Sequence, residues 1–153
     1  MTPAPDSGPF FGIGIAGARK AGNLGALARS GHAFGASLVF AIGFQPTQMD
    51  ASVDTTKASR HLSLAEYSTI AEFIALGPRR CELVGVEYGV DAATSLPSFA
   101  HPRRALYLLG GEGDGLGAEA LAACHHLVEI PSRYPLNVAT AGSIVLYDRV
   151  SKG

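Results

Sequence analysis

Short apolar runs, bounded by glycine, proline and polar residues, recur along the chain. Runs of this length between turn-forming residues predict buried β-strands. They are Phe10–Ala16, Ser37–Ile42, Leu83–Val86, Ala105–Leu109 and His126–Ile130.

Between these runs, apolar residues return at helical spacing. The helices that this predicts are Asn23–Phe34, Leu64–Leu76, Ala118–Cys124 and Leu136–Val150. In the last helix we expect Leu136, Ala139, Ile144 and Tyr147 to pack against the core. Strands that alternate with helices predict an α/β domain with a mainly parallel sheet and flanking helices.

The length of 153 residues is typical of one domain, which we expect to span residues 10–153. Residues 1–9, with three prolines, are expected to be a disordered or frayed tail, and Gln45–His61 a mobile loop. We expect no signal peptide and no membrane span, because the apolar runs are short. Cys81 and Cys124 stand alone, which fits a reducing compartment, so we expect a soluble, cytoplasmic protein.

Twelve basic and 13 acidic residues give a net charge of −1, which argues mildly against nucleic-acid binding. A few arginines can nevertheless serve a local contact with RNA phosphates. The pairs Arg19-Lys20, Arg79-Arg80 and Arg103-Arg104 are candidates, although such pairs are more often solvated surface.

Gly12–Gly17 spells the dinucleotide-binding pattern GxGxxG. That fingerprint requires the glycines between a strand and a helix, with an acidic residue about 20 positions further on. Here the glycines begin inside a predicted strand, and the next acidic residue is Asp50. We therefore reject a Rossmann site, and keep a nucleotide-binding oxidoreductase only as a remote alternative.

Three other stretches each have an ordinary structural explanation. Asn23–Gly35 can be an amphipathic helix with an asparagine cap, and Leu108–Leu116 a flexible glycine turn after a strand. Ile130–Ala139 can be a proline-stiffened connection in which Asn137 caps the last helix. Taken together, in this order, they resemble the three motifs of the SpoU-type (TrmH-like) branch of the SPOUT RNA methyltransferases.

The resemblance spans roughly residues 10 to 150. The first motif, N-x-G-x-x-x-R-x-x-x-x-F-G, is matched by Asn23, Gly25, Arg29, Phe34 and Gly35. The second, G-x-E-x-x-G-L, is matched by Gly110, Glu112, Gly115 and Leu116. The third is matched by Ile130, Pro131, Leu136, Asn137, Val138, Ala141, Leu146 and Tyr147. The chain departs from the family where its third loop is short, Ser132–Tyr134, and where Pro135 replaces a common serine.

The resemblance implies an α/β fold whose C-terminal segment forms a trefoil knot, a feature that general topology rules disfavour. It further implies S-adenosyl-L-methionine as cofactor and a homodimer that completes the active site. The residues that it implies at the cofactor are Val86, Leu109, Gly110, Gly111, Glu112, Ile130, Leu136 and Asn137. The reaction that it implies is methylation of a ribose 2′-hydroxyl in RNA, with tRNA favoured and rRNA open.

Arg29, Asn23, Glu112 and Asn137 are the catalytic candidates that the resemblance implies. We expect Arg29 to clamp a phosphate and orient the hydroxyl, because a guanidinium with a pKa above about 12 is a poor general base. Asn23 is expected to orient Arg29 or the RNA backbone.

Cys124-His125-His126 lacks the spacing of a metal site, so we predict no metal. Pro135 and the short loop leave a non-catalytic RNA-binding protein of the same fold as the main alternative. Retention of Arg29, Glu112 and Asn137 argues against it. A purely structural module, which would bind neither nucleotide nor cofactor, is a further one.

Overall fold

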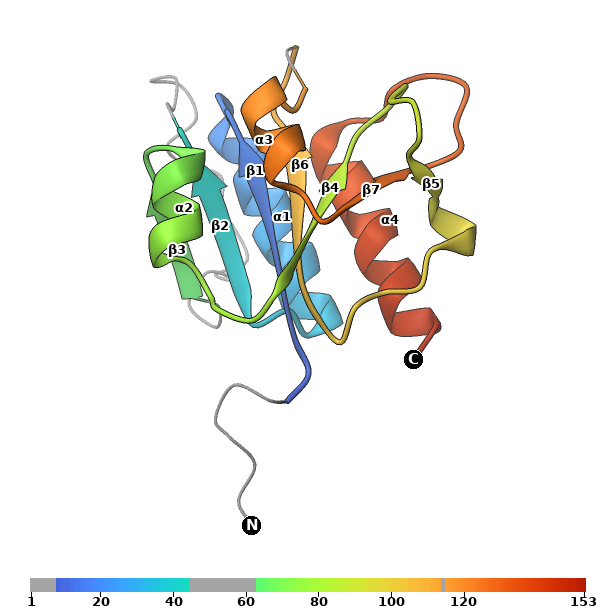
Figure 1. The fold of residues 1–153 in the computed structure, drawn as a ribbon, viewed down its shortest axis with the longest axis horizontal. Helices are drawn as coiled ribbons and strands as arrows, with labels where there is room; N and C mark the ends of the chain where they lie inside the picture. The colour runs from blue at the N-terminus through green and yellow to red at the C-terminus, as the bar shows by residue number, and fades with distance from the viewer. Residues whose placement is uncertain (1–7, 45–62, 114) are drawn as a thin grey trace.

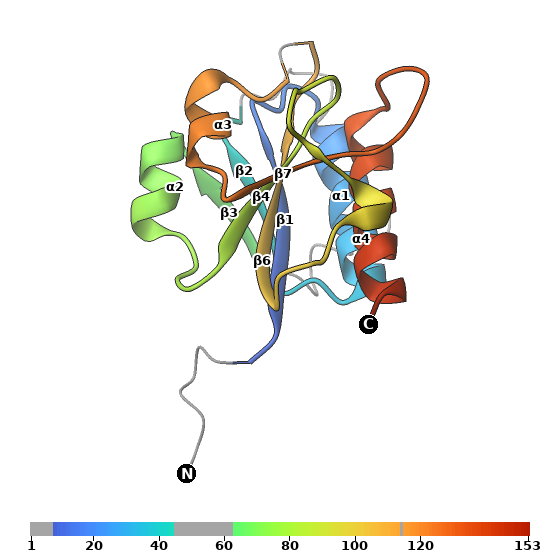
Figure 2. The ribbon, with the colours of Figure 1, turned by 45° about the vertical axis from the view of Figure 1, so that its right-hand side comes forward.

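A computed structural model describes residues 8–44, 63–113 and 115–153. It shows a central sheet between two layers of helices (Figures 1 and 2). The predicted tail is described only at residues 8 and 9, and the predicted loop Gln45–His61 lies outside the described residues.

The sheet has seven strands, all paired in parallel, in the order β3-β2-β1-β6-β4-β7-β5. The strands are β1 (Phe10–Ala16), β2 (Leu38–Ile42), β3 (Ser63–Tyr67), β4 (Glu82–Val86), β5 (Thr94–Ser95), β6 (Arg104–Gly110) and β7 (His126–Glu129). The predicted α/β class with a mainly parallel sheet is therefore confirmed.

Helices cover both faces of this sheet. They are α1 (Ala21–Phe34), α2 (Ile70–Leu76), α3 (Ala118–Ala123) and α4 (Val138–Ser151), with a 3-10 turn η3 (Leu96–Ser98). Helices α1 and α4 pack on one face and α2 and α3 on the other (Figure 2). Strand β6 serves both cores, because Tyr107 and Leu109 face the first pair and Leu106 and Leu108 the second. None of the helices described is long and apolar enough to cross a membrane.

The helix predicted over Leu64–Leu76 is wrong in its first part. Residues Ser63–Tyr67 form β3, which pairs in parallel with β2 at the edge of the sheet. The helix begins only at Ile70, because the side chain of Thr69 caps it by accepting a hydrogen bond from Glu72 N at 3.1 Å. Tertiary pairing therefore overrides a local apolar pattern that fits either structure.

The last helix forms as predicted, but with a different buried face. Of the expected core positions only Ala139 is buried, while Ile144 and Tyr147 are exposed by 36% and 63%. The buried side of α4 contains small residues: a Cβ at Gly142 would lie 2.4 Å from Leu27 of α1. The close approach of α1 and α4 at Gly142 fixes the rotation of α4, so that Val145 and Leu146 are buried while Ile144 and Tyr147 point outward.

Candidate functional site

The loops that follow β4, β6 and β7 meet at the carboxyl ends of these parallel strands (Figure 1). They enclose a cavity of about 470 Å³. Its lining residues are Val86, Glu87, Tyr88, Leu109, Gly110, Gly111, Glu112, Gly113, Gly115, Ile130, Ser132, Pro135, Leu136, Asn137, Val138 and Ala141. This is the edge at which open parallel sheets generally bind ligands.

All eight residues predicted at the cofactor line this one cavity. They are Val86, Leu109, Gly110, Gly111, Glu112, Ile130, Leu136 and Asn137. They come from segments up to 51 residues apart (137 − 86 = 51), so the fold joins the second and third motifs at one place.

Two glycines in the loop after β6 are required by close backbone contacts. A Cβ at Gly110 would lie 2.5 Å from Cα of Gly115, within the same loop. A Cβ at Gly111 would lie 2.3 Å from the carbonyl oxygen of Gly17, at the end of β1. The loop is therefore folded tightly on itself and against β1, and the predicted bare backbone of the cavity depends on this packing.

Three polar side chains, one from each motif, are joined by hydrogen bonds, and we call Asn23, Glu112 and Asn137 the cavity relay. Glu112 and Asn137 line the larger cavity, and Asn23 lies behind them, outside its lining. Asn23 Nδ2 donates to Glu112 Oε1, and Asn137 Nδ2 donates to Asn23 Oδ1 at 3.2 Å. The Glu112 carboxylate also accepts from the backbone N of Arg19 at 3.3 Å. Asn137 Oδ1 in turn caps α4 by accepting from Ala139 N at 2.9 Å.

A second, smaller cavity of about 210 Å³ adjoins the first. Its lining residues are Ala16, Gly17, Arg19, Gly43, Gly111, Glu112 and Gly115. Glu112 lines both cavities, so its carboxylate stands at the boundary between them.

Sequence reasoning missed Glu87 and Tyr88, which hold the cavity loops together. The Glu87 carboxylate accepts from Leu116 N and Tyr88 N, and the Tyr88 hydroxyl donates to the carbonyl of Arg133 at 3.1 Å. These contacts connect the loop after β4 to both other loops. The available signal was a carboxylate directly after a buried strand, at the ligand-binding edge of a parallel sheet.

Pro135, the position at which the family resemblance leads us to expect a serine, lines the cavity. Ser132 of the same short loop also lines it, and its hydroxyl donates to the carbonyl of Tyr134 at 2.8 Å. The Ser132 hydroxyl therefore forms its hydrogen bond within its own loop.

Arg29 is an exposed residue of α1 outside the cavity lining. It follows Asn23 by six residues, which places it about 9 Å further along the helix and about 120° around it. The Asn23 carboxamide faces Glu112 and Asn137. The geometry thus assembles three of the four catalytic candidates and sets Arg29 apart from them.

The glycines at the start of the GxGxxG stretch are required by the close packing of neighbouring strands. Gly12 and Gly14 are inside β1, and a Cβ at Gly14 would lie 2.4 Å from the ring of Phe40. Helix α1 begins only at Ala21. This placement lacks the strand-to-helix turn of a dinucleotide site.

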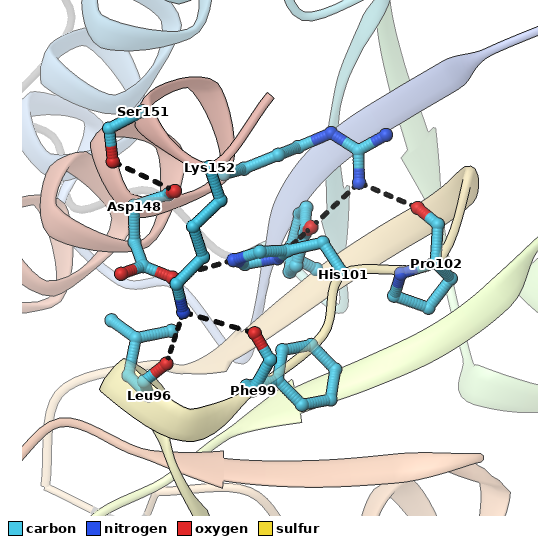
Figure 3. Close-up of polar contacts among 9 residues, drawn as sticks. Leu96, Phe99, His101, Pro102, Asp148, Ser151 and Lys152 are labelled. Carbon is cyan, nitrogen blue, oxygen red and sulfur yellow. Dashed lines mark hydrogen bonds and ion pairs between the residues drawn. The ribbon is translucent and has the colours of Figure 1, made fainter.

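A second polar cluster, which sequence reasoning missed, lies at the other end of α4. We call His101, Tyr107, Asp148, Arg149 and Lys152 the C-terminal clamp. Figure 3 labels three of its members, His101, Asp148 and Lys152. His101 contacts the Tyr107 hydroxyl through Nδ1 at 2.6 Å and Asp148 through Nε2 at 2.7 Å. Lys152 Nζ donates to the carbonyls of Leu96 at 2.7 Å and Phe99 at 3.0 Å.

Burial and hydrogen bonding together shift the pKa values within the clamp. Arg149 NH1 donates to the Tyr107 hydroxyl at 2.9 Å, and the same hydroxyl lies 2.6 Å from His101 Nδ1. Burial lowers the pKa of His101 and outweighs the opposing effect of Asp148. Burial likewise raises the pKa of Tyr107. For Asp148, burial acts to raise the pKa, but hydrogen bonds from Lys152 and His101 lower it overall.

Among the described residues, no three His, Cys, Asp or Glu side chains are grouped to hold a metal ion. His125 Nδ1 accepts from Leu83 N at 2.8 Å, and His126 Nε2 contacts Glu82 at 3.0 Å. Burial raises the pKa of the Cys124 thiol to about 11, which keeps it protonated at neutral pH.

The larger cavity combines apolar side chains, bare glycine backbone and two carboxylates. Leu109, Ile130 and Leu136 can contact a flat ring, while loop amides and carbonyls can bind its polar edge. Glu87 and Glu112 favour a ligand that carries positive charge. The site therefore suits a ligand with a heterocyclic ring and a cationic group.

Residues 11–147 of the chain match the model of the SpoU rRNA Methylase family. No curated protein matches the chain.

Solved structures also match the chain. The SpoU methyltransferase AviRb from Streptomyces viridochromogenes, in complex with AdoMet, is 26% identical with a TM-score of 0.84, over 97% of this chain and 59% of that one. The AdoMet-bound rRNA methyltransferase from Sinorhizobium meliloti is 22% identical with a TM-score of 0.80, over 96% and 58%. A structure concerned with the 2-OH methylation of C/U34 on tRNA is 22% identical with a TM-score of 0.75, over 92% and 94%. The chain thus spans about three fifths of the first two of these structures.

Proposed function

The chain belongs to the SpoU rRNA methylase family, and from this premise we propose that it transfers the methyl group of S-adenosyl-L-methionine to RNA. The observation that carries the proposal is the cavity relay, in which Asn23 is hydrogen-bonded to Glu112 and Asn137, two residues that line the cavity. We assign residues 10–153 to a single catalytic domain.

The residues present fit this cofactor. Val86, Leu109, Ile130 and Leu136 would hold the adenine and ribose, and the backbone of Gly110 and Gly111 would approach them closely. A volume of about 470 Å³ is within the range of small-molecule sites. When bound, S-adenosyl-L-methionine supplies a methyl group on a positively charged sulfur. The Glu112 carboxylate, fixed by Asn23 and by Arg19 N, contributes negative charge at that wall.

We propose that the acceptor is a ribose 2′-hydroxyl. Methyl transfer is an in-line displacement, so the protein's task is to hold the acceptor oxygen in line. The smaller cavity beyond Glu112 is the space that we assign to the acceptor nucleotide. Arg29, exposed on α1 and outside the cofactor cavity, is assigned to an RNA phosphate that it would bind through two hydrogen bonds.

For the RNA class we propose tRNA, with rRNA as the alternative. Support comes from the structure concerned with 2-OH methylation on tRNA, which matches this chain over nearly the whole length of both proteins.

We also propose that the C-terminal segment is knotted. In the sheet, Val128 of β7 pairs with Val86 of β4 on one side and with Thr94 of β5 on the other. The loop that joins β4 to β5 must therefore cross β7, and the chain continues from β7 into α4. A strand inserted beneath an earlier loop is the arrangement that a trefoil knot requires.

The active form that we propose is a homodimer built on α4. Large apolar side chains are exposed on α4 and the loop before it: Tyr134 by 76%, Leu136 by 39%, Ile144 by 36%, Tyr147 by 63% and Val150 by 49%. Grouped apolar surface of this kind is typical of protein interfaces. Sedimentation equilibrium should give twice the chain mass, and Tyr147→Lys should shift the protein to monomer; a monomeric wild-type protein would contradict this assignment.

The experiment that tests the function is transfer of radiolabelled methyl from S-adenosyl-L-methionine to total tRNA and, separately, to total rRNA. Analysis of the nucleosides should give a labelled 2′-O-methylnucleoside. Arg29→Ala should bind the cofactor like wild type in calorimetry and lose transfer by about 10²-fold or more. Equal transfer by this variant would remove Arg29 from its assigned role.

One specific observation favours a second candidate, the non-catalytic RNA-binding protein. Pro135 lines the cavity at the position of the usual serine. Cofactor binding without transfer to either RNA class would favour this candidate, and binding of a nicotinamide cofactor alone would favour the oxidoreductase.

A further inference from the structure

The loops at the amino ends of β4 and β6 carry two arginine pairs, Arg79-Arg80 and Arg103-Arg104. These strands are neighbours in the sheet, and both loops lie at its lower edge in Figure 1, opposite the cavity. Strand β6 has seven residues, so the two edges are about 20 Å apart. The fold thus brings together two pairs that are far apart in the sequence.

Arg104 holds these loops together. Its Nε donates to the carbonyl of Arg80 at 3.1 Å, its NH1 to that of Gly8 at 2.9 Å and its NH2 to that of Arg79 at 3.4 Å. Its guanidinium also lies 5.0 Å above the ring of Phe10. Arg104 therefore has a structural role, and its contacts fix the backbone that presents the other three arginines.

Those three, Arg79, Arg80 and Arg103, are exposed. Within the described part of the chain, their side chains make no hydrogen bond or ion pair. Arg80 has a φ of 58°, a conformation uncommon for any residue other than glycine. Arg104 holds Arg80 in this conformation through its hydrogen bond to the Arg80 carbonyl. A backbone outlier of this kind suggests that the Arg80 side chain has a function.

Four arginines, three of them exposed, gather here although the whole chain has a net charge of −1. The nearest carboxylate in the sequence is Glu82, which already contacts His126 at 3.0 Å. Segment 96–107 contains no acidic residue. Local excess of one sign attracts an oppositely charged partner and guides its approach.

We infer that Arg79, Arg80 and Arg103 form a second RNA contact, which binds backbone phosphates about 20 Å from the methyl-transfer site. The inference rests on the proposed function. Neither cavity is lined by these residues, which favours an extended polyanion over a small ligand. Guanidinium groups bind phosphate through paired hydrogen bonds, and the arginine cluster would hold the RNA while one nucleotide enters the site.

The test is filter binding of labelled total tRNA and total rRNA to the full chain, between about 50 and 200 mM KCl. Arg79→Gln/Arg103→Gln removes two exposed charges and leaves the strained Arg80 and the structural Arg104 intact. We expect affinity to fall on the order of tenfold, and the slope of log K against log salt to fall by about 2. The matched variant Arg79→Lys/Arg103→Lys keeps the charges and should keep the slope.

Both variants should retain wild-type melting temperature and calorimetric affinity for S-adenosyl-L-methionine, which excludes misfolding. Wild-type RNA affinity and slope in Arg79→Gln/Arg103→Gln would overturn the inference while leaving the proposed function standing. If the wild-type protein binds the cofactor but neither RNA, the proposed function fails instead, and the inference with it.

Discussion

Helix α4 has a polar cluster at each end, and the two clusters differ in what surrounds them. At its N-terminus, the cavity relay consists of the half-buried Asn23 and Glu112 and the exposed Asn137, and Glu112 lines both cavities. At its C-terminus, the C-terminal clamp includes Tyr107, which is fully buried, and His101, whose side chain is only 6% exposed. The 14-residue helix separates them by about 20 Å.

The difference shows how similar groups acquire different uses. In the clamp, the polar side chains are hydrogen-bonded to one another, and Arg149 and Lys152 also donate to backbone carbonyls. Such a cluster fixes the helix and leaves no room for a ligand. In the relay, the carboxylate of Glu112 is oriented by hydrogen bonds but still borders open space. A binding or catalytic group must be held in a fixed orientation and must also be accessible to its ligand.

The largest expected effect comes from breaking the relay at its centre. Asn23→Ala removes the donor to Glu112 and the acceptor for Asn137. Because the site is preorganised by these bonds, we expect methyl transfer to fall by about 10²-fold. The free energy of unfolding should change by less than about 1 kcal/mol, because the relay is half-exposed.

The control for Asn23→Ala lies on the same helix. Ser30 Oγ contacts Ser143 Oγ at 2.7 Å between α1 and α4, away from either cavity. Ser30→Ala should keep transfer within about twofold while costing about 1 kcal/mol of stability. Equal losses of methyl transfer in the two variants would mean that α1 contributes to activity only through its packing against α4.

The reverse pattern is expected in the clamp. Tyr107→Phe removes the hydroxyl that links Arg149 to His101 and leaves each of these half-buried residues with one hydrogen bond fewer. Chemical denaturation should show a loss of about 2 kcal/mol, with unchanged calorimetric affinity for S-adenosyl-L-methionine. Tyr147→Phe, at an exposed tyrosine of α4, should leave stability within about 0.5 kcal/mol. Reduced cofactor affinity in Tyr107→Phe would show that the two ends of α4 are coupled.

A smaller effect should appear in the loop beside the relay. Gly110→Ala places a methyl group 2.5 Å from the backbone of Gly115, which cannot rotate away. Displacement of the loop should weaken S-adenosyl-L-methionine binding by about tenfold in calorimetry. Gly117→Ala is the matched control, because a Cβ there meets nothing within 4 Å. Similar affinity in both variants would show that the cavity does not depend on this close packing.

The relay could be anticipated from the sequence and the clamp could not. Asn23, Glu112 and Asn137 belong to the three motifs by which the sequence resembles a known family. His101 and Tyr107 belong to none of these motifs, and their hydrogen-bond partners follow only from where α4 ends. The meeting of the arginine pairs likewise depends on the neighbouring positions of β4 and β6.

Some elements of the fold could likewise be predicted from the sequence and others could not. Strands buried on both faces are unbroken apolar runs, so β1 and β6 were predicted to within a residue. The edge strand β3 is short and partly polar, and only its pairing with β2 distinguishes it from a helix. The buried face of α4 was missed because a close approach at Gly142 decides it, and hydrophobicity alone does not.

The smallest expected effect is the pH dependence that His101 gives to the clamp. Its pKa in the folded protein lies below the ordinary value of 6.5, so between these two values the unfolded chain binds more protons. Stability should therefore be full above about pH 6.5 and decline as pH falls through the folded pKa. Asp148, whose pKa is also lowered, acts in the same direction, but only below about its ordinary value of 3.8. Thermal unfolding followed by circular dichroism at pH 7, 6 and 5 should show a falling melting temperature in wild type and a flatter profile in His101→Gln. Parallel profiles would mean that other groups carry the acid sensitivity and that the clamp tolerates a charged histidine, although burial and the positive charges of Arg149 and Lys152 lower the pKa of His101.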